Sequence, residues 1–340
     1  METLQIREIE ESQDFNSNTL FQEIPFTQMP FYGTWQEALG RKVRSFVIED
    51  GEPVAYFQIV KYPLIGSRSY LYIPYGPMVK EYSDELLLFI KKELKRIAKE
   101  EQAVFVRVDF TPASEDIAKF FKKAPGYTYH SAYFQPRLEW VLDLEGSEEE
   151  MLMARKKKTR YSIRLGEHEG IKIEFVEENF KDYFEDFYRL MSETAERNGF
   201  SLHVKDYYKS IFENLKSEYA YLVLAKDGDK VLVVNLIIIS GQTANYVFGA
   251  SSREEDKKMP AYLAQWKSIM KAKERGCRVY SFGGVSDKEG KYHGWEGLTL
   301  FKKKFGGREL KHGDFFDLVV NPFWYNLYNF RKLLKSLISW

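Results

Sequence analysis

The sequence predicts a mixed α/β (α+β) protein built from two similar domains in tandem. The main reason is an internal repeat of long period, in which a hairpin, a third strand, a helix and a buried strand occur twice in the same order. The turn signals Asp50-Gly51 and Asp227-Gly228 mark the two hairpins. The third strands end in Tyr75-Gly76-Pro77 and Phe248-Gly249-Ala250 at nearly the same separation. A chain of 340 residues is long enough for two domains with their own cores.

The first copy of the repeat follows an expected edge strand and a short helix. Ser83 is a favourable N-cap for the long helix of this copy, and Pro112 breaks the chain after its buried strand. The Glu145-Gly146-Ser147 segment reads as a boundary, which gives a first domain of residues 1–146. The expected elements are strand Leu4–Ile9, helix Tyr32–Leu39, strands Val43–Glu49, Val54–Tyr62 and Tyr70–Tyr75, helix Ser83–Glu101, strand Ala103–Asp109, a short helix, and strand Trp140–Leu144.

The second copy gives a second domain of residues 147–316. It opens with a basic helix and a long helix whose apolar residues recur at helical spacing. Pro260 suits the first turn of a later helix, and Gly276 suits the position just past its end. The remaining expected elements are helix Phe180–Arg197, strands Tyr219–Lys226, Val231–Ile239 and Asn245–Gly249, and the buried strand Arg278–Phe282.

Composition excludes several classes of protein. The formal net charge is zero, so any nucleic-acid contact must come from a local basic patch. The single cysteine, Cys277, excludes an internal disulfide framework and fits a reducing cytoplasm. The charged N-terminus does not resemble a signal peptide, and the longest apolar run, Val231–Ile239, is too short to span a bilayer. Metal-ligand spacing, a Walker loop and a Rossmann fingerprint are all missing from the sequence, and we expect no cofactor.

The end of the second copy resembles a known family. The matching residues run in the order Pro260-x-x-Leu263-x-x-Trp266, Ala272-x-x-x-Gly276, Phe282-Gly283-Gly284 and Gly297-Leu298-x-x-Phe301-Lys302-x-x-Phe305-Gly306. In order and spacing they resemble the FemABX family, whose members are aminoacyl-tRNA-dependent peptidyltransferases that build peptidoglycan cross-bridges. Many relatives carry Asp where this chain has Ser281.

The resemblance implies a tandem pair of GNAT-like domains with a cleft between them. It also implies that the C-terminal segment 317–340 returns to complete the first domain. Some members of the family carry a long coiled-coil arm in the second domain. No pair of heptad repeats interrupts the stretch from Gly170 to Val204, so we expect an armless, FemX-like form.

Two residues are the candidates for catalysis. Attack of an amine on an ester needs a fixed positive charge to stabilise the oxyanion, and Lys302, next to Phe301 and near Phe305, is the candidate. The plainer interpretation is a lysine on the solvated face of an amphipathic helix. Asp109 ends a buried strand, and the family places an Asp in this Arg-x-Asp context facing the cleft, where it could orient or deprotonate the incoming ammonium. The plainer alternative is an aspartate that stabilises a turn.

The expected phosphate contacts come from a basic helix. Lys156, Arg160 and Arg164 are spaced to form one stripe, which could hold the phosphates of tRNA or of a pyrophosphate. The alternative is a solvated polybasic face. The family has a similar basic helix at this place.

The expected substrate contacts are aromatic residues and one histidine. His203 and Tyr207 lie four residues apart and could share a face, in a segment where the family contacts phosphate and peptide. Tyr246 and Phe248 are expected to alternate onto one face of their strand, where the resemblance implies aromatic residues next to the acceptor peptide, and Phe301 is a further candidate for substrate binding. Each could instead be a core or surface residue without function.

Three functions remain open from the sequence. The leading hypothesis is an aminoacyltransferase that moves an amino acid from aminoacyl-tRNA to a stem-peptide amine of a peptidoglycan precursor, either lipid II or a UDP-linked muropeptide. The second is a GNAT-like N-acyltransferase that uses acyl-CoA or acyl carrier protein. The third is a non-catalytic protein that binds cell-wall precursors or RNA. In the leading hypothesis the protein is a monomer in the cytoplasm with contact to the inner face of the membrane.

The C-terminal segment after Asn321 predicts an amphipathic helix. Phe323, Leu327, Phe330 and Leu334 form one apolar stripe that we expect to dock on the first domain. A second hypothesis is that Trp324, Trp340 and the basic residues of another side, Arg331, Lys332 and Lys335, touch the membrane surface.

Overall fold

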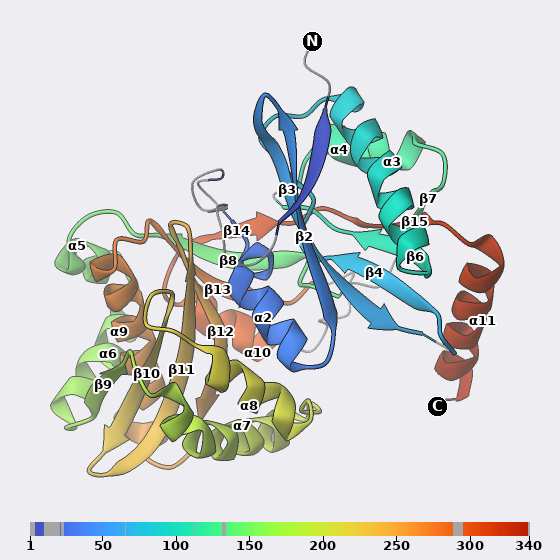
Figure 1. Ribbon diagram of the computed structural model, residues 1–340. Coiled ribbons are helices and arrows are strands. Elements are labelled where there is room, and N and C mark those ends of the chain that lie inside the picture. Colours follow the sequence, from blue (N-terminus) through green and yellow to red (C-terminus); the bar gives the residue numbers. More distant parts are fainter. Residues whose placement is uncertain are drawn as a thin grey trace. The chain divides into compact units, whose positions relative to one another are not determined.

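The computed structural model describes residues 4–9, 21, 24–64, 66–111, 113–130, 134–287 and 295–338. By backbone contacts the chain divides into two compact units (Figure 1). Unit 1 consists of Met1–Leu20, Thr27–Arg137 and Lys311–Trp340, and unit 2 consists of Phe21–Phe26 and Leu138–Leu310.

Unit 1 is built on an eight-stranded sheet. Its order is β1-β2-β3-β4-β6-β15-β7, with β5 paired to β3, and only β4 and β6 run parallel. The strands are β1 (Gln5–Ile9), β2 (Lys42–Asp50), β3 (Glu52–Pro63), β4 (Ser69–Ile73), β5 (Met78–Val79), β6 (Ala103–Val108), β7 (Tyr127–His130) and β15 (Phe315–Val319). The helices are η1 (Phe26–Gln28), α2 (Pro30–Ala38), α3 (Asp84–Glu100), α4 (Glu115–Lys123) and α11 (Pro322–Ile338).

Helix α3 connects the two parallel strands of unit 1. It begins where Ser83 Oγ accepts the Leu86 N–H at 3.1 Å, and Asp84 and Glu85 lie in its first turn, where carboxylates favour a helix. The apolar face of α3 packs on β6 and the neighbouring strands, where the core includes Leu94, Ile97 and Val106. The expected cap and buried strand of the first copy are therefore present.

Unit 2 is built on a seven-stranded sheet of order β14-β8-β13-β12-β11-β10-β9, in which β12 and β13 run parallel. The strands are β8 (Leu138–Asp143), β9 (Lys172–Val176), β10 (Ala220–Asp227), β11 (Lys230–Ser240), β12 (Thr243–Ser251), β13 (Val279–Gly284) and β14 (Arg308–Lys311). The helices are α5 (Glu148–Met153), α6 (Lys157–His168), η2 (Phe180–Tyr183), α7 (Phe184–Asn198), α8 (Lys205–Asn214), η3 (Asp256–Lys258), α9 (Pro260–Glu274) and α10 (Glu296–Lys303).

The two sheets repeat one arrangement. In unit 1 the strands β2, β3 and β4 pair antiparallel in sequence, and α3 then leads to β6, which is parallel to β4. In unit 2 the strands β10, β11 and β12 pair in the same way, and α9 leads to β13, which is parallel to β12. The mixed α/β fold class and the internal repeat are confirmed.

Each sheet also contains strands that lie outside the repeat and pair with residues distant in the sequence. Strand β8 pairs with β13 and β14 in unit 2, although its residues precede the boundary expected after residue 146. Strand β15 lies between β6 and β7 of unit 1, and Arg107 holds Asp317 through two hydrogen bonds of 2.7 Å. The domain boundaries 1–146 and 147–316 stay a prediction.

Between Gly170 and Val204 the structure has β9, η2 and the 15-residue helix α7. The stretch thus has no coiled-coil arm, as expected for an armless form. Among the residues that the structure describes, every helix is too short or too polar to cross a bilayer.

Helix α11 packs on unit 1 with a different face from the one expected. Tyr325 is buried, its ring lies 5.3 Å from that of Phe105, and its hydroxyl donates to Asp317 Oδ2 at 2.9 Å. The predicted stripe is wrong as the docking face, because Phe323 and Phe330 are 72% and 57% exposed. The hydrogen bond from Tyr325 to the buried carboxylate orients the helix with its tyrosine face toward the sheet. A pattern of apolar residues does not reveal such a polar contact. Trp340 and the Lys335 side chain lie outside the described residues.

Candidate active site

Lys302 is a buried lysine near the end of α10. Only 4% of its surface is exposed, and its Nζ donates a hydrogen bond of 2.6 Å to the carbonyl oxygen of Gly284. The next two residues, Lys303 and Lys304, are exposed. The apolar pattern of α10 therefore places one of three consecutive lysines inside the protein and two at its surface.

Aromatic packing and one hydrogen bond fix α10. Phe305 is fully buried against Phe282, and Phe301 packs edge-on against Tyr262 with 5.3 Å between the rings. Near the start of the helix, Thr299 Oγ1 accepts the backbone N–H of Ser286 at 2.8 Å. These contacts hold the Lys302 backbone rigidly, so its ammonium is preorganised.

Two glycines let the β13 backbone approach this lysine. Gly283 has a φ of +71°, and a Cβ at this position would lie 3.9 Å from Lys302 Nζ and 3.4 Å from the Tyr246 carbonyl oxygen. The parallel pairing of β13 with β12 ends at Asn245 and Ser281, just before this point. The Lys302 ammonium thus lies just past the point where the hydrogen-bonded pairing of β12 and β13 ends.

A carboxylate lies in the same cluster. Ser281 Oγ donates to Glu139 Oε2 at 3.0 Å and accepts the Gly283 N–H at 3.0 Å. Glu139 belongs to β8 and is paired in register with Gly284, the residue that holds Lys302. The cluster of Glu139, Ser281, Gly283, Gly284 and Lys302 is called the lysine cluster below.

The environment lowers the pKa of Lys302 to about 8, because burial disfavours the charged ammonium, while the negative charge of Glu139 opposes this shift. The lysine can therefore change its charge within the working range of an enzyme. Gly284 takes one of the three N–H donors of the ammonium. A developing negative charge on a bound substrate is the kind of partner that such a cation stabilises.

Sequence reasoning missed Glu139. Its strand was expected, but its pairing with β13 depends on residues far apart in the chain. One signal was available: the family resemblance implies Asp at the position of Ser281, so a carboxylate at this place would have to come from another strand. The structure shows that Glu139 lies within hydrogen-bonding distance of that serine.

Asp109 belongs to unit 1, whereas Lys302 belongs to unit 2. Asp109 is fully buried and accepts two hydrogen bonds, from the Tyr75 N–H at 2.6 Å and from the Tyr72 hydroxyl at 3.0 Å. Burial raises its pKa to about 7. These contacts fit the turn-stabilising alternative, since Tyr75 has a φ of +55° and opens the Gly76-Pro77 turn.

The predicted basic stripe lies on and just before α6. Lys156, at the N-cap, and Arg164 are exposed. The guanidinium of Arg160 instead donates to the carbonyl oxygens of Met153, at 3.2 Å, and Arg155, at 2.6 Å, and so caps the end of α5. Two of the three side chains are therefore exposed for phosphate contacts, and the third holds the turn between two helices.

The structure brings His203, Tyr207 and Phe248 to one aromatic cluster. The rings of His203 and Tyr207 lie 4.2 Å apart, at the start of α8. Tyr208 is buried beside them and lies 5.4 Å from Phe248 of β12. His203 is exposed and Tyr207 is half-buried, so this cluster reaches the surface through these two residues.

Tyr246 and Phe248 do not share a face, so that expectation is wrong. Phe248 pairs with Leu236 and Tyr246 with Ile237, and the intervening Val247 forms a β-bulge. Since Leu236 and Ile237 point to opposite faces, so do their partners. Phe248 meets α7 and α8, whereas Tyr246 packs into the core beneath α9, and burial raises its pKa.

Comparison with known proteins identifies the chain's relatives. The model of the FemAB family matches residues 8–227 and 224–332, which is most of the chain. The chain belongs to the FemAB family. A curated relative, the lipid II:glycine glycyltransferase of Staphylococcus haemolyticus, is 23% identical to this FemAB protein over 84% of this chain and 85% of that one.

Solved structures support the same fold. A crystal structure of FemX matches with a TM-score of 0.80 at 20% identity, over 94% of this chain and 99% of that one. A tandem GNAT protein from the clavulanic acid biosynthesis pathway matches with a TM-score of 0.56 at 10% identity, over 94% and 99% of the two chains. At these identities the likeness concerns the fold, and the expected tandem pair of GNAT-like folds is confirmed for this FemAB protein.

Proposed function

We propose that this FemAB protein transfers an amino acid from aminoacyl-tRNA to a stem-peptide amine of a peptidoglycan precursor. The observation that carries the proposal is the lysine cluster, a buried ammonium beside a carboxylate in a protein of this family. Relatives are named lipid II:glycine glycyltransferases, which favours lipid II over a soluble muropeptide as the acceptor. The site of action is then the cytoplasmic side of the membrane.

In the proposed reaction, the neutral acceptor amine attacks the ester carbonyl carbon of the aminoacyl-tRNA. A C–N bond forms, negative charge develops on the carbonyl oxygen, and the C–O bond to the tRNA ribose then breaks. Lys302 donates a hydrogen bond to that oxygen. One preorganised donor of this kind contributes about 3–4 kcal/mol to transition-state stabilisation.

The proton balance assigns a role to Glu139. The acceptor amine arrives as an ammonium and must lose a proton before it attacks, and a second proton leaves as the amide forms. One proton returns to the departing ribose oxygen. Glu139 is half-buried in the same cluster as Lys302, so we assign to it the task of attracting and deprotonating the acceptor. Asp109, the residue first expected in this role, is fully buried and binds the Tyr75 backbone, which favours a structural role.

The other predicted residues remain proposals of binding. Lys156 and Arg164 are exposed and suit contact with tRNA phosphates, and Arg160 supports them by fixing the α5–α6 turn. For the precursor we propose the aromatic cluster at His203, Tyr207 and Phe248 and, near the lysine cluster, Tyr246 and Phe301. The proposed chemistry needs no cofactor, and we propose a monomer.

The test is a transfer assay. The protein is incubated with a pool of charged tRNAs and lipid II, and the products are identified by mass spectrometry. We expect an acceptor that is heavier by one amino-acid residue or more, and no product when the tRNA is uncharged. A parallel reaction with acetyl-CoA tests the GNAT-like alternative; acetylated acceptor together with no tRNA-dependent product would overturn the proposal.

A further inference from the structure

One side of α11 exposes large apolar side chains. Phe323, Phe330 and Leu334 are 72%, 57% and 39% exposed, and we call them the α11 stripe. They recur at positions i, i+7 and i+11, so they lie along one side of the helix. Large apolar side chains gathered in this way mark an interaction surface more often than single exposed residues do.

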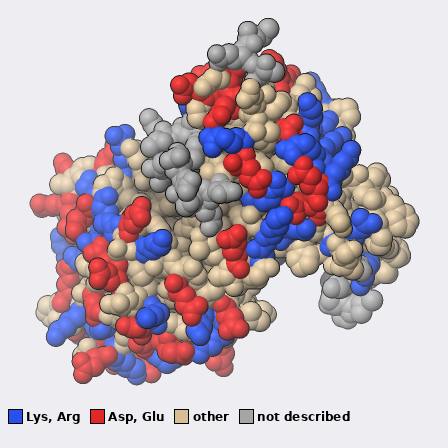
Figure 2. Space-filling view, viewed as in Figure 1, with Lys and Arg blue, Asp and Glu red and all other residues tan. Residues whose placement is uncertain are grey.

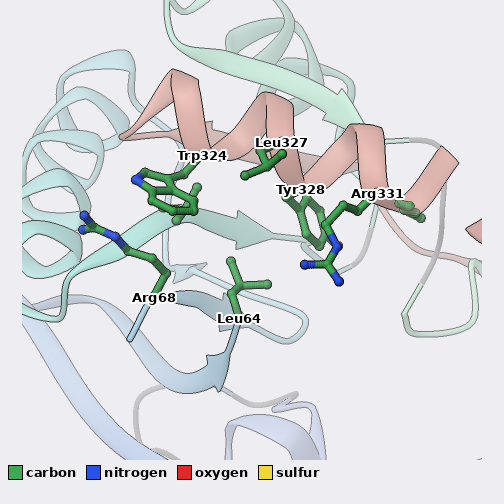
Figure 3. A pocket seen from close by; sticks show the side chains of 8 residues that line it. Leu64, Arg68, Trp324, Leu327, Tyr328 and Arg331 are labelled. Atoms are coloured by element: carbon green, nitrogen blue, oxygen red, sulfur yellow. The ribbon is translucent and has the colours of Figure 1, made fainter. Parts of the chain in front are cut away.

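A groove runs beside the stripe. It encloses about 390 Å³ and is lined by Leu64, Arg68, Val104, Trp324, Leu327, Tyr328, Arg331 and Lys332, which we call the α11 groove. Figure 3 shows Arg68 and Arg331 toward opposite ends, with Leu64 facing the helix between them. The guanidinium of Arg68 lies 5.3 Å from the centre of the Trp324 ring, so this cation is held over an aromatic wall.

The charge of the helix is all of one sign. The segment Pro322–Ile338 contains no Asp or Glu, and its charged residues are Arg331, Lys332 and Lys335. In Figure 2 the surface over α11 is mainly uncharged, with basic patches. Apolar side chains flanked by cations are the composition of a helix that lies in the interface of an anionic membrane.

We propose that the α11 stripe and the α11 groove form a docking surface for the anionic surface of a lipid bilayer. The stripe enters the boundary between headgroups and acyl chains, and Arg68 and Arg331 meet lipid phosphates. Tyr325 and Tyr328 already hold the helix against Phe105, so the surface is formed before binding and needs no folding step. The proposal goes beyond the transfer reaction and does not rest on it.

Charge complementarity decides between occupants. A second copy of the chain would bring the same cations against themselves along a symmetric contact, which like-charge repulsion opposes. An anionic bilayer satisfies the cations and the apolar stripe together. Docking on this surface also brings unit 1 to the place where a lipid-linked acceptor would reside.

The test is sedimentation of the intact protein with vesicles. We expect binding to vesicles of phosphatidylglycerol and phosphatidylcholine, weak binding to phosphatidylcholine alone, and weaker binding to both as salt is added. The double variant Phe330→Ser/Arg331→Gln should lower the partition coefficient for anionic vesicles by about tenfold or more. Both side chains are exposed, so the thermal unfolding temperature should stay close to that of wild type.

A matched control lies on α3. The double variant Leu88→Ser/Lys92→Gln also removes one exposed apolar residue and one exposed cation from a helix of unit 1. It should bind anionic vesicles as wild type does. An equal loss in this control, or no binding of wild type at low salt, would overturn the proposal. So would a wild-type dimer in sedimentation velocity that Phe330→Ser converts to a monomer, since the occupant would then be a second copy. Aminoacyl transfer in detergent can persist in each of these cases.

Discussion

The two sheets solve the same structural problem in different ways. Each sheet contains one parallel strand pair that is connected through a helix, β4 and β6 in unit 1 and β12 and β13 in unit 2. The two pairs differ in what occupies their ends. In unit 1 this end is occupied by Asp109, which binds the backbone of Tyr75, and Gly76 forms a bridge to Asp109. In unit 2 the corresponding end presents Gly283 and the buried ammonium of Lys302.

This difference separates a structural role from a chemical one. The buried carboxylate of Asp109 accepts hydrogen bonds from the Tyr72 hydroxyl and the Tyr75 N–H, so its acceptors are used within the protein. A buried ammonium held by one carbonyl and flanked by a carboxylate keeps a capacity to bind an anionic oxygen. In unit 1 the end of the parallel strand pair is thus occupied by the protein's own contacts, whereas in unit 2 it carries a reactive group, and changes at Lys302, Glu139 and Asp109 can test this difference.

The largest expected effect comes from Lys302→Ala. It removes the proposed oxyanion donor, so transfer should fall on the order of 100-fold or more while the protein remains folded. The matched control is Lys303→Ala, since Lys303 is the next residue, carries the same charge and is exposed. Single-turnover transfer measures both. If Lys302→Ala were active and Lys303→Ala inactive, the catalytic lysine would be Lys303 and the assignment to Lys302 would be wrong.

A smaller loss is expected for Glu139→Gln. The change removes the carboxylate but keeps the side-chain shape, and general acid–base groups contribute about 10²–10⁴-fold in rate. We expect a loss near the lower end, because the acceptor amine can also lose its proton to water. The control is Glu149→Gln, on the exposed surface of α5. Equal rates for Glu139→Gln and wild type at every pH would remove Glu139 from the mechanism.

Asp109→Asn should change stability more than chemistry. The folded-state pKa of Asp109 is raised to about 7 from an ordinary value of 3.8, so ionisation costs stability and the cost grows as pH rises from about 4 through 7. The Asn variant lacks this cost. The difference in free energy of unfolding between the Asn variant and wild type should therefore increase by on the order of 2 kcal/mol, in favour of the variant, from pH 5 to pH 8. Denaturant unfolding at both pH values measures this. Transfer reduced as far as in Lys302→Ala would instead show that Asp109 is catalytic.

The smallest effects concern the basic residues of unit 2. Lys156→Ala and Arg164→Ala should each reduce the slope of log affinity for tRNA against log salt by about 0.7–0.9. Arg160→Ala should lower the unfolding temperature, because its guanidinium caps α5. Filter binding across a salt series gives the slopes. Unchanged slopes for both exposed residues would show that this helix face only meets solvent.

Local signals predicted the framework of both copies. The Asp-Gly turns gave the hairpins, Ser83 gave the start of α3, and Pro260 and Gly276 bracketed α9. The spacing of Phe301 and Phe305 also suggested which of the three lysines is fixed by packing. These features depend on residues close together in the chain, whose preferences can be read from sequence.

Features that depend on distant residues could not be predicted. The role of Glu139 follows from the pairing of β8 with β13, and the separation of Tyr246 from Phe248 follows from a bulge set against β11. The docked face of α11 follows from Tyr325 and a buried carboxylate of β15. In each case a contact between elements distant in sequence overrides the local pattern.

The most direct test of the account is the pH dependence of single-turnover transfer. With Lys302 acting as a cation, the rate should rise with pH as the acceptor amine loses its proton, and this rise should stop near pH 8, where Lys302 becomes neutral. Because Glu139 raises the pKa of Lys302, Glu139→Gln should move the pH at which the rise stops to a lower value, whereas Lys303→Ala should leave it in place. A wild-type rate that keeps climbing at the same slope through pH 9 would contradict a cationic role for Lys302.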